Sequence, residues 1–233
     1  MPQIVQITRV TTPLSQKPRQ SEGGGGKKLA VKSKIFEREE HPGTAFRKFY
    51  ERGDLPVAIV HANKSSITWK IPIDKLNLQH YLPLFVDGVR EQQQPYMFLA
   101  SEGSSVLVRS TAGTDRLLAL VPQLILPLKH GLETRDVKTM IRVLKLIQDL
   151  IQACPAVGEA LVPYYRQLLP VLNVFVHKKE LATEIEETLA MLEISGGEDA
   201  FVNIKYVCPT YESHASSATP VESVLTNQPK RTQ

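Results

Sequence analysis

Three apolar helical patterns follow one another between residues 117 and 176, and this stretch constrains the fold more than any other part of the chain. In the middle pattern, apolar residues recur at steps of three and four, so they share one face of a helix. The residues on that face are Val137, Met140, Ile141, Leu144, Ile147, Leu150 and Ile151. The third pattern has the same spacing in Leu161, Tyr165, Leu168, Leu172 and Phe175. A core made of stacked amphipathic helices is therefore predicted.

Local signals predict where these helices begin and end. Asp136 suits the N-cap of the middle helix, because its carboxylate can accept a hydrogen bond from the first turn. Gly131 and Cys154-Pro155 are predicted stops, since glycine favours helix ends and proline cannot continue a helix. A further helix over residues 180–194 has an acidic start and a glycine pair after its end, which fits the helix dipole and the C-cap preference.

The same stretch contains an internal recurrence. Leu-Pro pairs occur at Leu82-Pro83, Leu126-Pro127 and Leu169-Pro170, which places the prolines 44 and 43 positions apart. Ala-Leu-Val-Pro occurs at residues 119–122 and again at 160–163. A period of roughly 40–47 residues is typical of HEAT and armadillo arrays, whose units bury their apolar faces by stacking. Chance recurrence of a common pair is the alternative. The pattern predicts an all-α, armadillo/HEAT-like helical repeat domain.

The rest of the chain divides around this domain. Residues 1–43 are predicted to be a flexible arm, because they contain four consecutive glycines, several prolines and few apolar residues. Residues 44–212 are predicted to form the domain, and residues 213–233 a flexible tail.

Within the domain, the first elements are predicted to be short. Thr44 can cap a helix that closes at Gly53. Residues 57–60 and 67–71 are rich in β-branched residues, which predicts short strands. Helices are then predicted from Asn77, and from Pro95 to about Ser110, although Gly103 weakens the second of these. Residues 201–207 are predicted to be extended.

The positive charge of the chain is concentrated in the arm. Residues 1–40 carry eight basic and four acidic side chains, so the whole net charge of +4 lies there and the remainder is balanced. A cationic arm suits an anionic partner surface, and nucleic acid, acidic lipid and the acidic face of tubulin all qualify. A solvated tail without a partner is the alternative.

No motif in the sequence predicts catalysis. The six histidines form no metal-binding pattern, and no nucleophile elbow or phosphate-binding loop is present. The two cysteines, Cys154 and Cys208, are expected to be buried free thiols of an intracellular protein. We therefore expect no cofactor, no bound metal and no enzymatic activity.

Tyr164-Tyr165-Arg166 is the most unusual polar cluster. Consecutive residues cannot share one helix face, so Tyr164 or Arg166 is expected to face outward for a partner, unless a tyrosine hydroxyl bonds inside the domain.

Five segments stand out along residues 44–213: AFRKFYERGDLP (45–56), HYLPLFVDGV (80–89), VPQLILPLK (121–129), ALVPYYRQLLPVLN (160–173) and GGEDAFVNIKYVCPTYES (196–213). In this order they resemble the Parkin co-regulated protein family. The short connection after Val176 and the tail after Ser213 depart from other members.

The resemblance implies a structural protein of the axoneme in cilia and flagella. Family members lie at the inner junction of doublet microtubules, where the B-tubule closes onto the A-tubule. The implied partners are α/β-tubulin and a small β-sandwich junction protein, with neither nucleic acid nor a membrane. The arm would then contact tubulin through Arg9, Lys17, Arg19, Lys27, Lys28, Lys32 and Lys34. Tyr164 and Arg166 would contact a partner. A soluble adaptor or chaperone-associated scaffold in the cytoplasm is the other hypothesis.

Overall fold

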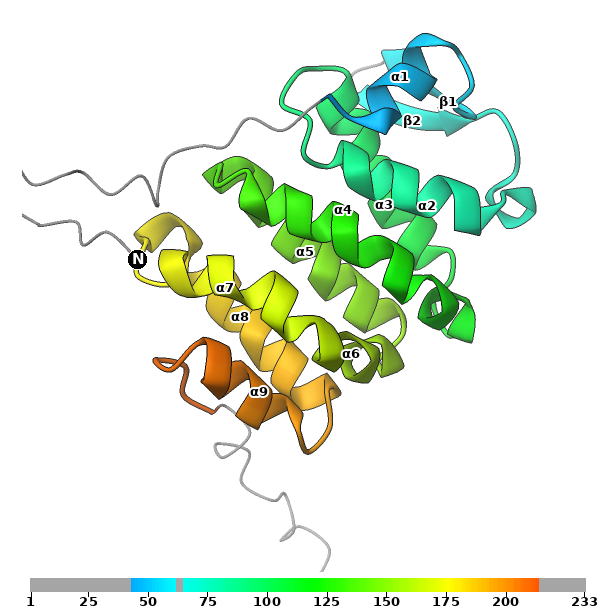
Figure 1. The fold of residues 1–233 in the computed structure, drawn as a ribbon. Helices are drawn as coiled ribbons and strands as arrows, with labels where there is room; N and C mark the ends of the chain where they lie inside the picture. The colour runs from blue at the N-terminus through cyan, green and yellow to red at the C-terminus, as the bar shows by residue number, and fades with distance from the viewer. Residues whose placement is uncertain (1–42, 62–64, 214–233) are drawn as a thin grey trace, which may run out of the picture. The chain divides into compact units, whose positions relative to one another are not determined.

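The computed structural model describes residues 43–61 and 65–213, and this part is mostly helical (Figure 1). The prediction of an all-α fold is confirmed. The α-helices are α1 (Ala45–Glu51), α2 (Leu78–Gly88), α3 (Tyr96–Arg109), α4 (Val121–Glu133), α5 (Val137–Ala153), α6 (Ala156–Leu161), α7 (Tyr165–Phe175), α8 (Lys179–Ser195) and α9 (Ala200–Val207). Short 3-10 helices are η2 (Ile73–Lys75), η3 (Asp115–Leu120) and η4 (Val162–Tyr164), and the strands are β1 (Val57–His61) and β2 (Ser65–Trp69).

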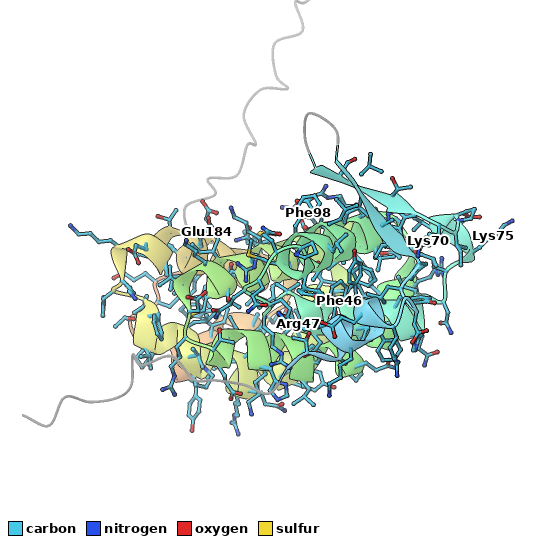
Figure 2. All side chains as sticks on the ribbon, turned by 90° about the horizontal axis from the view of Figure 1, so that it is seen from above. Phe46, Arg47, Lys70, Lys75, Phe98 and Glu184 are labelled. Carbon is cyan, nitrogen blue, oxygen red and sulfur yellow. The ribbon has the colours of Figure 1, made fainter. Side chains whose placement is uncertain are left out.

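The helices form two layers. We call α2, α4 and α7 the proline layer, because each contains an internal proline, and α3, α5 and α8 the long-helix layer. Within the first layer α2 packs on α4 and α4 on α7, and within the second α3 packs on α5 and α5 on α8. The two layers are separated in the view of Figure 2. At the C-terminal end, α9 packs against α7 and α8.

The recurrence in the sequence follows the proline layer. Pro83, Pro127 and Pro170 lie inside α2, α4 and α7, in equivalent central positions. The two Ala-Leu-Val-Pro copies mark helix transitions, from η3 to α4 and from α6 to η4. The proline that ends each Ala-Leu-Val-Pro copy has no N–H to donate, so the first and third predicted helical patterns are each divided into shorter helices. The recurrence is therefore structural, while the armadillo or HEAT type of the repeat stays a prediction.

The first elements agree with their sequence signals. Arg47 N–H donates to Thr44 Oγ1 at 3.1 Å, so Thr44 caps α1 as predicted. The strands β1 and β2 pair antiparallel, with Val57 opposite Trp69. The Trp69 ring lies 5.6 Å from that of Phe85, which anchors the hairpin on the helices.

The core lies between the two layers and contains the predicted apolar stripes. Leu144 and Leu168, from different layers, are 0% and 3% exposed. Asp136 caps α5 as predicted, since the Thr139 N–H donates to its Oδ2 at 3.1 Å. Burial of these stripes is the main driving force that holds the helices together.

The predicted stop at Gly131 is wrong, because α4 continues through it to Glu133. The glycine serves close packing instead: a Cβ there would lie 2.6 Å from Val143 Cγ2 on α5. The chain turns at Arg135, which has a φ of 53°.

The predicted extended segment over residues 201–207 is also wrong, because these residues form α9. Their β-branched and aromatic residues favour a strand locally. The helix nevertheless buries Ala200 and Ile204, four residues apart, against α7 and α8. Tertiary packing therefore overrides the local preference.

Candidate functional site

The sequence predicted contacts in two places, and the structure describes one of them. The seven arm residues named as tubulin contacts lie outside the described residues. Tyr164, Tyr165 and Arg166 lie where η4 meets α7.

These three consecutive residues face different surroundings. Tyr165 is buried, and its hydroxyl donates to the carbonyl of Leu192 at 3.1 Å. Burial raises the pKa of the Tyr165 hydroxyl, so it stays protonated and keeps donating. Tyr164 is half-buried and Arg166 is exposed. One tyrosine hydroxyl therefore bonds inside the domain and Arg166 faces outward, while the partner contact of Tyr164 and Arg166 stays a prediction.

Arg166 belongs to a surface that α7 and α9 make together. Its guanidinium carbon lies 5.2 Å from the ring centroid of Tyr206 on α9. Tyr206 is 73% exposed and Val202, one turn earlier, is 66% exposed. We call Arg166, Val202 and Tyr206 the α7–α9 surface, whereas Tyr164 packs partly buried against the core. An arginine beside a tyrosine and an aliphatic side chain is a composition common at protein interfaces.

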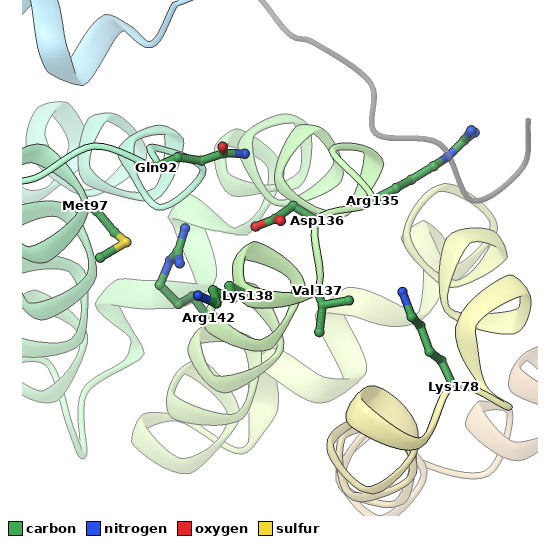
Figure 3. Close-up of a pocket in the computed structure, with 8 residues that line it drawn as sticks. All are labelled: Gln92, Met97, Arg135, Asp136, Val137, Lys138, Arg142 and Lys178. Carbon is green, nitrogen blue, oxygen red and sulfur yellow. The ribbon is translucent and has the colours of Figure 1, made fainter.

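A second candidate site lies where the long-helix layer begins (Figure 3). A cavity of about 540 Å³ is lined by Met97 in the first turn of α3, by residues 135–138 and 142 at the start of α5, and by Lys178 at the N-cap of α8. We call it the helix-start pocket. It exists because the helices of this layer all present their N-terminal ends to it.

The helix-start pocket is strongly basic. Its charged lining residues are Arg135, Asp136, Lys138, Arg142 and Lys178, which gives a formal net charge of +3. Among the described lining residues the one carboxylate is that of Asp136, which caps α5 by accepting from the Thr139 N–H and hydroxyl. Within the part of the chain that the structure describes, no carboxylate forms an ion pair with Lys138 or Lys178. The positive ends of the helix dipoles add to this charge.

Arg142 is held in place by neutral groups. Its guanidinium donates to the carbonyls of Val89 and Glu91 at distances between 2.9 and 3.2 Å, and to the Thr139 hydroxyl at 3.0 Å. Burial lowers the pKa of this guanidinium, and the nearby Asp136 opposes that shift. Arginine still stays charged at neutral pH. The pocket therefore contains a fixed positive charge.

Sequence reasoning missed the helix-start pocket. Lys138 and Arg142 are four residues apart, so they share a helix face, and that spacing was a local signal. Lys178 comes 40 residues later and joins them only because α8 packs beside α5. No local pattern contains that information.

The described residues contain no group of three or more histidine, cysteine or carboxylate side chains that could hold a metal ion. Cys154 and Cys208 are free and buried, as predicted. Burial raises the pKa of the Cys208 thiol to about 11, so it is not a thiolate at neutral pH. In the same residues, no helix combines the length and hydropathy needed to cross a bilayer.

Comparison with known proteins identifies the class of this helical domain. The family model of the Parkin co-regulated protein matches residues 44–213, which is all of the helical part. The chain is also 44% identical over 193 residues to the mouse protein named "Parkin coregulated gene protein homolog", covering 76% of this chain and 79% of the mouse protein. The chain therefore belongs to the Parkin co-regulated protein family, as the resemblance implied.

Proposed function

We propose that this chain is a non-enzymatic structural protein of ciliary and flagellar axonemes, where it binds doublet microtubules and bridges the A- and B-tubules at the inner junction. The observation that carries the proposal is the family match, which extends over the entire helical domain rather than one short motif. The proposed location is the axonemal cytoskeleton.

Two parts of the chain have the chemistry that this role needs. The arm contains the whole net positive charge of +4, which favours the acidic surface of tubulin. The α7–α9 surface exposes Tyr206 and Val202 beside Arg166, and we assign it to the neighbouring β-sandwich junction protein. Contacts of arginine and tyrosine at the centre of an interface often dominate the binding energy.

Co-sedimentation with microtubules over a series of salt concentrations tests the tubulin contact. Deleting residues 1–40 should leave the domain folded and weaken binding several-fold. This loss of binding accumulates over several contacts, because each exposed charge contact is worth only about 0.2–1 kcal/mol and is screened by salt. Reversing Lys27, Lys28, Lys32 and Lys34 to glutamate should produce part of that loss.

Each outcome either supports or contradicts the proposed tubulin contact. If full-length and truncated proteins bind equally, the arm is a solvated tail and the tubulin contact lies on the helical domain. If neither binds reconstituted microtubules or isolated doublets, the adaptor or scaffold hypothesis replaces this one. Electron cryomicroscopy of isolated doublets, with the chain located at another site or absent, would also contradict the proposal. An Arg166→Ala, Tyr206→Ala double variant should still bind tubulin but lose the junction protein.

A further inference from the structure

We propose that the helix-start pocket is a docking site for a short carboxylate-rich peptide segment of a partner protein. The inference rests on the charge and geometry of the pocket, and it stands whether or not the proposed function is correct. None of its described lining residues belongs to the α7–α9 surface.

Charge is the first reason. The pocket lining carries a net charge of +3 at a cavity of about 540 Å³, and its one carboxylate is already hydrogen-bonded to the first turn of α5. Lys138 and Lys178 are exposed, so their amines can move to meet a ligand. In Figure 3 the Lys178 side chain extends toward Val137 at the start of α5, whereas Arg135 points away from the other cations. The cations that face a ligand are therefore Lys138, Arg142 and Lys178.

A lining residue shared by two cavities favours an extended ligand. Arg142 also lines a second cavity of about 480 Å³ between α3 and α5. Hydroxyl and amide side chains there include Ser101, Ser105 and Gln148. Glu102 and Asp149 offset most of the positive charge of that cavity. A ligand that follows both cavities would place its carboxylates in the helix-start pocket and a neutral polar stretch between α3 and α5.

The lining chemistry favours a peptide over a nucleic acid. Single-stranded nucleic acids are bound by basic grooves whose aromatic side chains stack on the bases. Among the residues that the structure describes, the uncharged lining of the helix-start pocket consists of Gln92, Met97 and Val137, none of which has an aromatic ring. Met97 and Val137 can instead contact the methylene groups of glutamate side chains. Lysine amines on flexible stems suit carboxylates that are spaced along a chain.

The test measures binding of fluorescein-labelled decaglutamate to the full-length protein by fluorescence anisotropy. The Lys138→Glu, Lys178→Glu variant should weaken binding at least tenfold at about 50 mM salt, a concentration at which exposed charges are only partly screened. Lys138→Gln, Lys178→Gln changes half as much charge and should give a smaller loss. Both positions are exposed, so the variants should keep the helical circular dichroism spectrum and the thermal midpoint of the parent.

A matched control removes the effect of net charge. Lys70 and Lys75 are exposed, and Figure 2 shows them together at one end of the domain, away from Glu184 on α8. Lys70→Glu, Lys75→Glu alters the total charge equally and should change affinity less than twofold. Equal losses in the two variants would overturn the proposal. So would a loss confined to the variant with Lys27, Lys28, Lys32 and Lys34 reversed, because the arm would then bind the peptide.

A competing polyanion tests the class of ligand. Ten-residue oligothymidylate should compete with decaglutamate at least tenfold less well than unlabelled decaglutamate does. Equal or better competition that depends on Lys138 and Lys178 would show a nucleic-acid site and contradict the peptide assignment. Because no microtubules are present, failure here leaves the proposed function untouched.

Discussion

The two helix layers of the domain solve the same packing problem with different sequences. The helices α2, α4 and α7 of the proline layer have 11, 13 and 11 residues, and each contains a central proline. The helices α3, α5 and α8 of the long-helix layer have 14, 17 and 17 residues without an internal proline. Both layers bury apolar stripes in one core, so the two layers differ from each other on the surfaces that face away from that core.

The prolines are tolerated because of where they lie. Each removes the hydrogen bond to the carbonyl four residues earlier, and those residues are Gln79, Gln123 and Arg166. All three are exposed, so water can satisfy the carbonyls. The long-helix layer has continuous hydrogen bonding, and its helix N-termini surround the basic pocket. The proline layer therefore contains the sequence recurrence, and the long-helix layer contains the helix-start pocket.

Core truncations should show that the layers share one core. Leu144→Ala in α5 and Leu168→Ala in α7 should each lower the free energy of unfolding by about 2–5 kcal/mol, through lost burial and a residual cavity. Leu126→Ala is the matched control, since Leu126 is 58% exposed and should change stability by about 0.5 kcal/mol or less. Chemical denaturation measures all three. A large effect in one layer and none in the other would show two separately stabilised halves.

Introducing a proline into the long-helix layer and removing one from the proline layer should affect stability very differently. Lys145→Pro in the middle of α5 should cost about 3 kcal/mol or more, because it removes an internal hydrogen bond and clashes with the preceding turn. Lys145→Ala isolates the loss of the ion pair with Glu184, whose atoms are 3.6 Å apart. Pro127→Ala should change stability by about 1 kcal/mol or less, because α4 has already adapted to its proline. Equal costs for Lys145→Pro and Pro127→Ala would contradict this account.

A single added methyl group tests how closely the two layers pack against each other. A Cβ on Gly103 of α3 would lie 2.2 Å from Phe85 Cε1 on α2. Overpacking costs about 1–3 kcal/mol, while alanine gains up to about 1 kcal/mol in helix propensity. We therefore expect Gly103→Ala to lower stability by about 1 kcal/mol in thermal unfolding. Glu102→Ala, at an exposed neighbouring position, should be nearly neutral. A stabilised Gly103→Ala protein would show that the Phe85 ring moves aside freely.

The parts of the fold that could be predicted are those with a local signal that tertiary packing does not oppose. The stripes of α5 and α7, the caps Thr44 and Asp136 and the hairpin before α2 follow from residues close in the sequence. Helix periodicity and capping involve neighbours within about four residues, so the sequence contains the whole cause. The expectation that Tyr164 or Arg166 faces outward rests on the same geometry.

The wrong predictions at residues 201–207 and Gly131, and the missed helix-start pocket, share a different cause. α9 is helical because α7 and α8 cover Ala200 and Ile204, and Gly131 is an internal packing contact because Val143 of α5 lies against it. Lys178 joins Lys138 and Arg142 because α8 stacks on α5. The sequence by itself determined α5 and α7, the caps Thr44 and Asp136 and the buried faces of these two helices, since these depend on neighbours along the chain. Only the tertiary structure decided which helix ends meet at the basic pocket, because that depends on contacts between residues about 40 positions apart.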